Sequence, residues 1–453
     1  MIIGMEIQRG TLLKLFVPIF FETLLLMLSG IVDTLMLSSV PNGVGAVGTA
    51  NTYIGMFFIA LTVVSCGMIA VMTQYVGANK PGVALQARRV ALIANGALGL
   101  AASLILVFLS RPILVLLGTA DDLVQPASQY MRIVAIGSFF DAITLIFSAY
   151  LRVFKHTRAP FIATITGNAL NIGLNALFLF AFRAGVAGVA WATVIGKVVT
   201  LGLAIFLCLR LVKGKTFTER IQWKELLWTM VKIGFPAAIE SISYSIAMVF
   251  VMRFVNQMDV TGFNATAKSY TTQITNFSYC AAFALAQANS YLVGWRIGAK
   301  KFDECYKSTR GVMLIGIGLG VAVELIFALL GKFLIGVFTT DEQLIRIIGI
   351  ALFIDIGLEV GRASNLILGQ ALKTSGYSLI PSIFSAIVNV TVAVAGTYLF
   401  GLVLRWNVLG AMFALTLDEC CRALLLFFLW MSRRWQRTRV VTQEAEPDSP
   451  VSA

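Results

Sequence analysis

The sequence is poor in charged residues. Of its 453 residues only 13% are Asp, Glu, Lys or Arg, whereas 58% are hydrophobic, and the mean hydropathy is +0.87. A soluble domain carries about 25% charged residues, so this chain lacks the charge to cover a surface that faces water. The composition excludes an ordinary cytosolic enzyme and a disordered chain, and it favours a protein that crosses a membrane many times.

Cysteine and histidine are also scarce. The six Cys form no C-x-x-C pair, and the single His, His156, lies in a basic loop. These counts argue against a disulfide scaffold and against a zinc site. We therefore expect no catalytic residue, no metal and no cofactor. The first apolar stretch is too long for a signal peptide, so we interpret it as a retained helix.

Apolar runs long enough to span a membrane occur twelve times. They cover residues 12–38, 48–76, 90–118, 128–151, 160–182, 186–210, 228–257, 270–294, 311–337, 344–371, 379–404 and 408–432. In lipid every backbone N–H and C=O must be bonded within its own segment, so runs of this length are helices. The alternation of a transmembrane barrel is absent from them. The sequence predicts an all-α polytopic membrane protein with twelve transmembrane helices.

The distribution of positive charge predicts the topology. With a cytoplasmic N-terminus, 23 of the 35 Lys and Arg fall on the cytoplasmic side, five fall on the opposite side and seven lie within spans. Cytoplasmic loops carry such an excess. We expect a multi-pass protein of the cell inner membrane with both termini cytoplasmic. We therefore attribute the net charge of +13 to basic residues in the cytoplasmic loops. We expect the lipid bilayer as partner and no nucleic acid.

The chain is an internal repeat. Residues 76–80 match residues 297–301 at a shift of 221, and Pro18-x-x-x-Glu22 matches Pro236-x-x-x-Glu240 at a shift of 218. Six spans per half predict a parallel repeat, with two lobes related by a pseudo-two-fold axis along the membrane normal. We assign residues 1–212 to the N-lobe, 213–227 to a cytoplasmic linker, 228–433 to the C-lobe and 434–453 to a disordered cytoplasmic tail.

The first span carries two carboxylates and a proline. An ionisable group in hydrocarbon costs from about 2.5 to above 10 kcal/mol, so Glu22 and Asp33 must face protein or water. They are 11 residues apart and share one helix face. Pro18 removes a backbone hydrogen bond and predicts a hinge. The pattern fits an ion-coupled switch, although a structural polar role near each helix end remains the alternative.

Polar stripes occur in later spans. The fifth span places Asn171 and Asn175 on one face, where their amide oxygens would bind a cation beside a carboxylate or hydrogen-bond between helices. The tenth span carries Asp355, Glu359 and Arg362 on one stripe, either as a coupling site or as a static charge cluster.

Two further charged residues of the C-lobe are candidate site residues. Glu240 of the seventh span is a candidate for coupling or substrate binding. Arg362 corresponds to Asp141 at the 221 shift, so opposite charges occupy equivalent positions, and a salt bridge across the cavity is left open.

Several short motifs in order resemble one transporter family. They are Pro18 with Val32-Asp33-Thr34, Gly77-Ala78 and Gly298-Ala299, Asn171-x-x-x-Asn175, Gly185-x-x-Gly188 with Thr193, and Gly234-Phe235-Pro236. With the 6+6 repeat, residues 10–430 are similar to the multidrug and toxic compound extrusion (MATE) family.

The resemblance implies a monomeric secondary antiporter that exports organic cations or drugs in exchange for Na⁺ or H⁺ by alternating access. It implies an N-lobe cation site of Asp33, Asn171, Asn175 and Thr193. Some members have Asp where this chain has Asn175, so the site holds one formal negative charge. Arg362 stands where some relatives have an acid, which leaves Asp355 and Glu359 as C-lobe candidates.

Other functions stay open from the sequence alone. A flippase for lipid-linked oligosaccharides needs a basic lining, for which Arg253, Lys268 and Arg362 are the candidates against several acids. A membrane-embedded enzyme would need a nucleophile–base pair or a metal cluster, and a channel would not depend on an ion gradient.

Overall fold

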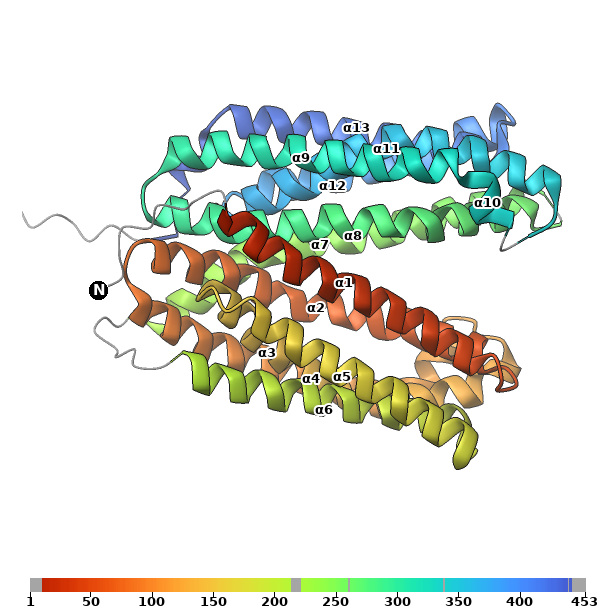
Figure 1. Ribbon diagram of the computed structural model, residues 1–453, viewed down its shortest axis with the longest axis horizontal. Coiled ribbons are helices and arrows are strands. Elements are labelled where there is room, and N and C mark those ends of the chain that lie inside the picture. Colours follow the sequence, from red (N-terminus) through yellow and green to blue (C-terminus); the bar gives the residue numbers. More distant parts are fainter. Residues whose placement is uncertain (1–9, 213–220, 260, 337–338, 439, 442–453) are drawn as a thin grey trace, which may run out of the picture.

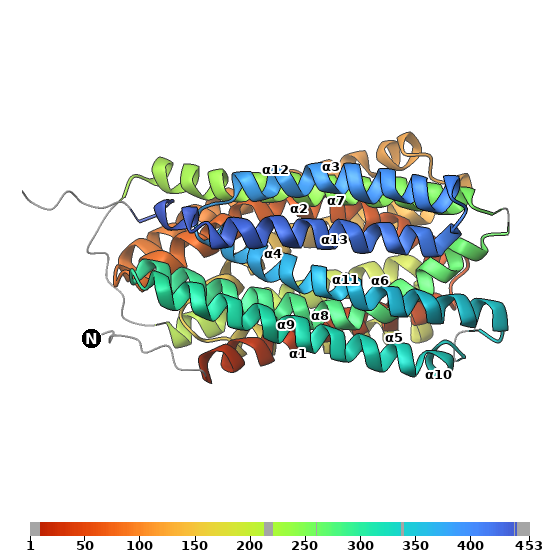
Figure 2. The same ribbon diagram turned by 90° about the horizontal axis from the view of Figure 1, so that it is seen from above.

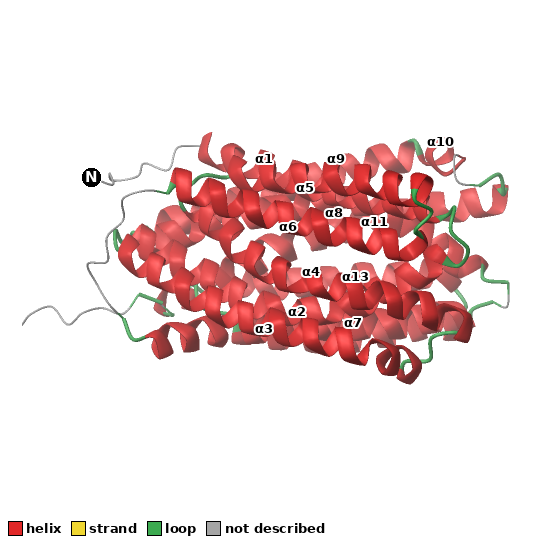
Figure 3. Cartoon of the chain, turned by 90° about the horizontal axis from the view of Figure 1, so that it is seen from below, coloured by secondary structure: helices red, strands yellow, loops and turns green. Residues whose placement is uncertain are grey.

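The computed structural model describes residues 10–212, 221–259, 261–336, 339–438 and 440–441. Within these ranges the chain consists of helices and connecting loops, and no strand occurs (Figure 3). The predicted all-α fold with twelve long helices in two lobes is confirmed.

The first half contains six long helices. They are α1 (Gly10–Leu37), α2 (Gly43–Gly77), α3 (Pro81–Leu116), α4 (Asp121–Val153), α5 (Arg158–Ala176) with a π-helical end (Leu177–Ala181), and α6 (Gly185–Leu211).

The second half repeats this order. Its long helices are α7 (Trp223–Gln257), α8 (Phe263–Gly298), α9 (Phe302–Leu329), α11 (Glu342–Thr374), α12 (Leu379–Val388) with π-helical continuations (Asn389–Val394 and Thr397–Val403), and α13 (Asn407–Met431). A short α10 (Gly331–Gly336) precedes α11, and a 3₁₀ turn (Arg434–Arg437) follows α13. Because α7 begins at Trp223, the end of the predicted linker is helical, and residues 213–220 lie outside the described part.

Among the described residues, nine helices are long and apolar enough to cross a membrane by length and composition alone. The other three long helices are α8, α11 and α13. Helix α11 packs against both others. Several polar side chains of these helices, among them Asn289, Glu359 and Asp418, are buried in the structure.

The two halves lie side by side with parallel long axes (Figures 1 and 2). Helix α2 packs against α7 and α8, and α1 packs against α8. Figure 1 shows that α1 begins and α13 ends at the same end of the molecule, which we call the terminal end.

Glycines permit the closest contact between the halves. A methyl group at Gly77 would collide with the carbonyl oxygen of Trp295, and one at Gly298 would collide with the carbonyl oxygen of Gln74. Both pairs are related by the 221-residue shift. The contact between α2 and α8 is thus symmetric and lies at the terminal end, where the halves meet backbone to backbone.

The prolines of α1 and α7 each leave one carbonyl without its helical donor. Pro18 frees the carbonyl of Lys14, which accepts a hydrogen bond from Thr157 Oγ1 at 2.9 Å. In the second half, Ser378 Oγ lies 3.5 Å from the carbonyl four residues before Pro236. A hydroxyl before the fifth helix of each half therefore compensates for the missing bond.

The prediction of a disordered tail from residue 434 is wrong for its first residues. Trp435 is 1% exposed, and its ring stacks on Trp430 with centroids 4.3 Å apart. The backbone N–H of Val440 donates to Gln74 Oε1 at 3.2 Å. The disordered tail was predicted from the polar composition of the C-terminal residues, which does not reveal that Trp435 is buried. Residues 439 and 442–453 lie outside the described part.

The symmetric glycine contact predicts a stability difference. Replacing Gly298 by Ala should lower the free energy of unfolding by about 1–3 kcal/mol, because the methyl group meets backbone that cannot move away cheaply. Gly311→Ala adds the same methyl where nothing lies within 4 Å, and it should be neutral or slightly stabilising because Ala favours helix. Thermal unfolding of the purified variants measures both. Equal midpoints for the two variants would contradict the packing argument.

Candidate functional site

A carboxylate and two amides meet between α1 and α5. Asn175 Nδ2 donates to Asp33 Oδ1 at 2.7 Å and lies 3.4 Å from Asn171 Oδ1. Asn171 Nδ2 lies 3.4 Å from Thr193 Oγ1 on α6. The structure thus brings together all four residues expected for the N-lobe cation site.

The surroundings of Asp33 contain no basic partner. In the part of the chain that the structure describes, Asp33 makes no ion pair, and it accepts a hydrogen bond from the neutral amide of Asn175. Asn175 is fully buried, and its Oδ1 has no hydrogen-bond partner there. Tyr130 of α4 lies beside Thr193 and Asn51. The sequence analysis missed Tyr130, whose type and position in an apolar helix gave no signal.

This arrangement can bind or release a cation. One carboxylate with amide and hydroxyl oxygens is a donor set that hard cations prefer, and the carboxylate alone can take a proton. An ionised carboxylate without a counter-charge is expensive inside a membrane. The site therefore favours a state in which Asp33 is neutralised.

Glu22 does not join Asp33, although both lie on α1. The 11 residues between them correspond to a rise of about 16 Å along the helix. Glu22 Oε2 pairs with Arg152 Nη2 on α4 at 2.6 Å, and Glu22 Oε1 accepts from Thr164 Oγ1 on α5 at 3.1 Å. The first span therefore serves two separate sites.

Glu240 of α7 has the equivalent environment in the second half. Its Oε2 lies 3.0 Å from Lys373 Nζ on α11 and accepts from Ser382 Oγ on α12 at 2.9 Å. Each half thus holds a carboxylate of its first helix between a base on the fourth helix and a hydroxyl on the fifth.

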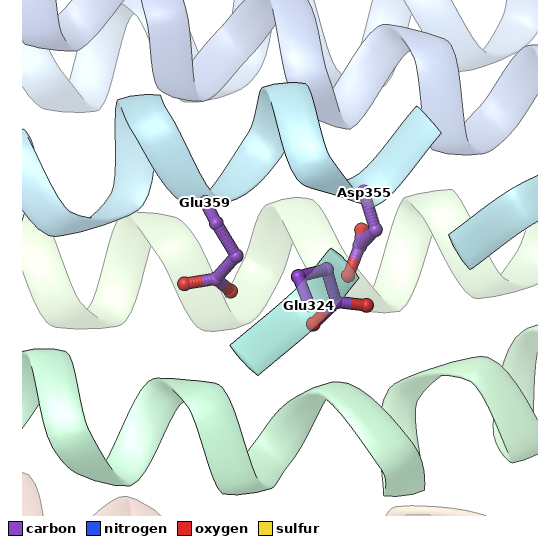
Figure 4. Close-up of side chains that lie close together, drawn as sticks. All are labelled: Glu324, Asp355 and Glu359. Atoms are coloured by element: carbon purple, nitrogen blue, oxygen red, sulfur yellow. The ribbon is translucent and has the colours of Figure 1, made fainter. Parts of the chain in front are cut away.

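Three carboxylates converge in the second half. Figure 4 shows Asp355 and Glu359 of α11 near Glu324 of α9, and each offers an oxygen within 4.8 Å of the others. They are 1%, 0% and 0% exposed respectively. Within the described residues, both carboxylate oxygens of Glu324 and of Asp355 lack a hydrogen-bond partner. Two of the three acids therefore have no group beside them that would stabilise a negative charge by hydrogen bonding.

Glu324 was missed by the sequence analysis. It stands in the apolar run Val321-Ala-Val-Glu-Leu of the ninth span, and a lone carboxylate in such a run was the available signal. Its partners come from another helix, and periodicity within one helix does not reveal them.

Arg362 and Asp141 pair with different partners. Arg362 forms an ion pair with Glu359, and Asp141 Oδ2 lies 2.7 Å from Lys197 Nζ on α6. The salt bridge between Asp141 and Arg362 that the sequence left open is not formed among the described residues. Each charge is neutralised within its own half, because a nearer partner exists there.

A cavity of about 680 Å³ lies among α7, α8, α11, α12 and α13, with Ile59 of α2 at its wall. We call it the C-lobe cavity. Its charged lining residues are Glu240, Lys268, Asp355, Arg362, Lys373, Glu419 and Arg422. This volume is within the range of small-molecule sites.

The sequence matches known proteins over most of its length. The MatE family model matches residues 18–177 and 236–399. The "Uncharacterized transporter YisQ" of Bacillus subtilis is 31% identical over 92% of this chain and 93% of its own. The "Probable multidrug resistance protein NorM" of Thermotoga maritima is 27% identical over 96% and 95%.

Solved structures share the fold. An outward-facing MATE family transporter superimposes with a TM-score of 0.84 at 19% identity, covering 93% of this chain and 95% of the other. Two structures described as the straight and the bent conformation of a MATE also score 0.84, at 20% identity, covering 93% and 94% of this chain and 95% of each of theirs.

The family model accounts for more than half of the chain, in two segments that repeat across the two halves. The resemblance noted in the sequence is confirmed. The chain belongs to the MatE family, and it is a multi-pass membrane transporter, not an enzyme.

Proposed function

We propose that the protein is a secondary active antiporter that exports organic cations, drugs among them, in exchange for Na⁺ or H⁺. The observation that carries the proposal is the Asp33 carboxylate, which has a neutral amide as its hydrogen-bond donor and no basic partner among the described residues. Relatives with multidrug resistance names support the substrate class.

The coupling step follows from the geometry of Asp33. In the outward state Na⁺ or H⁺ neutralises the carboxylate. Turning over the Asn175 amide would bring its unpartnered Oδ1 toward the same ion. Helix α1 then bends at Pro18, where the intrahelical ladder is already interrupted, and the bound cation leaves. Structures with this fold are described as the straight and the bent conformation of a MATE, and this step likewise requires two conformations.

In this proposal Glu324 and Asp355, which lie beside the paired Glu359, form a second coupling site. Three carboxylates this close cannot all be ionised, because like charges disfavour one another. Arg362 compensates for one of them. A proton or a cation supplies the remaining positive charge.

Glu22 and Glu240 are assigned to the scaffold. Each is bound to a base and to a hydroxyl within its own half. A carboxylate already paired with Arg or Lys has no reason to exchange its charge with a passing ion. These residues hold the first helix of each half against the fourth and fifth.

The protein acts as a monomer in the cell inner membrane, with both termini in the cytoplasm. The loop distribution of Lys and Arg supports this orientation. The terminal end then faces the cytoplasm, so that the α2–α8 contact closes that side.

The alternative of a lipid-linked oligosaccharide flippase has less support. It would need free basic residues along the cavity for a pyrophosphate. Of the four bases there, Arg362, Lys373 and Arg422 are each ion-paired. Lys268 remains, and a single ammonium does not make a basic lining.

Replacing Asp33 by Asn should abolish ion-driven export while leaving expression intact, because the amide carries no charge to exchange. The measurement is efflux of a fluorescent organic cation from proteoliposomes, with Na⁺ and pH gradients imposed separately. Asp122→Asn, at an exposed helix start, is the matched control and should transport normally. Wild-type efflux by the Asp33 variant would reject the proposal.

The scaffold role of Glu22 predicts strong coupling with Arg152. Arg152→Gln should destabilise the protein by about 3–5 kcal/mol, because it leaves a buried carboxylate unpaired. Adding Glu22→Gln should recover much of that loss. Thermal unfolding in detergent measures the coupling, and the exposed pair Asp303–Arg433 should show little. Additive effects of the two changes would refute an ion pair and reopen a coupling role for Glu22.

A further inference from the structure

The chain continues past α13 at the terminal end of the molecule, and we call its residues 434–438, 440 and 441 the C-terminal strap. The first part of the strap is fixed to the second half. The indole N–H of Trp435 donates to the carbonyl of Trp430 at 3.0 Å, and the Trp435 ring lies 6.4 Å from the ring of Phe302. Trp435 belongs to a hydrophobic cluster whose buried members all come from the second half.

The strap then passes over the turn between α11 and α12. Gly376 of this turn has a φ of +91°, in the left-handed region, and a methyl group on it would lie 2.8 Å from the carbonyl oxygen of Thr438. Glycine both adopts this backbone conformation readily and leaves room for the strap. The strap is therefore held on the second half at two points, Trp435 and Thr438.

The end of the strap reaches the first half. The backbone N–H of Val440 donates to Oε1 of Gln74 on α2 at 3.2 Å. Nε2 of the same Gln74 amide donates at 2.7 Å to the carbonyl of Thr374, the last residue of α11. Val440 and Val441 pack against a hydrophobic cluster, most of whose buried members belong to the first half. One side chain of the first half is thus bound on both sides of its amide by the second half.

Gln74 lies where the two halves would separate. It is 0% exposed, and its carbonyl oxygen is the atom that Gly298 of α8 approaches. Opening of the terminal end would move α2 away from α8. Because Trp435 keeps the strap on the second half, the Val440 N–H would then be drawn away from Gln74. An interaction that exists in only one of two conformations shifts the equilibrium toward that conformation.

We propose that the C-terminal strap stabilises the conformation in which the terminal end is closed, and that Val440 must detach from Gln74 before this end opens. The inference rests on the alternating access of the proposed function and identifies a segment that controls it. The strap contains none of the residues assigned to ion coupling. A change in the strap therefore alters how often the terminal end opens and leaves the ion sites intact.

Hydrogen–deuterium exchange of the purified full-length protein in detergent tests the proposal. Val440→Pro removes the N–H that Gln74 accepts, at a position outside any helix. We expect the backbone amides of residues 74–80 and 295–301 to exchange about fivefold faster than in the wild type. The reason is that loss of one hydrogen bond changes an equilibrium by about this factor, and opening of the terminal end exposes both helix ends together.

Three further variants complete the experiment. Val440→Ile keeps the N–H and a branched apolar side chain, so its exchange should equal that of the wild type. Trp435→Ala releases the strap from the second half and should accelerate exchange at both helix ends, as Val440→Pro does. Trp228→Ala, at a position that is 68% exposed, is the matched control and should not.

Two results would overturn the proposal. One is unchanged exchange at both helix ends in Val440→Pro, and this result decides even if Trp435→Ala fails to fold. The other is faster exchange confined to the strap and to residues 74–80, with residues 295–301 unchanged, because that pattern means local loosening without opening.

The test is separate from that of the proposed function, because exchange in detergent needs no gradient and no substrate. Faster exchange at both helix ends in Val440→Pro supports the strap even if wild-type proteoliposomes show no ion-driven export, a result that would reject the antiporter alone. Ion-driven export by the wild type together with unchanged exchange in Val440→Pro rejects the strap alone.

Discussion

A charged side chain within a membrane requires a partner, and the way in which each partner is supplied organises this structure. Away from the helix ends, six carboxylates of the long helices are matched by a base: Glu22, Asp141, Glu240, Glu359, Asp418 and Glu419. Asp33, Glu324 and Asp355 have no such partner among the described residues. The pairs of Glu22, Asp141 and Glu240 join different helices, whereas those of Glu359, Asp418 and Glu419 lie within one helix. The unmatched carboxylates are suited to exchange their charge with an ion that comes and goes.

The two halves share the paired carboxylates but differ in the unpaired ones. Both halves keep the same scaffold, which consists of a proline with a compensating hydroxyl, a carboxylate held by a base, and a glycine contact at the terminal end. The unmatched carboxylates differ between the halves. The first half places Asp33 beside amides, and the second half gathers three carboxylates between α9 and α11. A common frame therefore supports two chemically different sites, one of which adjoins the C-lobe cavity.

The sequence predicts what depends on spacing within one helix. The twelve spans follow from apolar runs, and the amide stripe follows from the 3.6-residue period, so Asn171 and Asn175 were found without a structure. Contacts between helices were not predictable in this way. Arg152 lies just beyond the fourth apolar run, 128–151, yet it pairs with Glu22 across 130 positions of the chain. Glu324 and Trp435 were missed because their partners come from elsewhere in the fold or from beyond an assumed boundary.

The central claim is that Asp33 exchanges a coupling ion against substrate. Its most direct measurement is ion release on substrate binding by the purified protein, followed with a pH indicator for H⁺ and with radioactive Na⁺. The account predicts that an organic cation displaces one of these ions from wild-type protein and that replacing Asp33 by Asn reduces this release. Undiminished release from that variant, or no release of either ion from the wild type, would contradict the account.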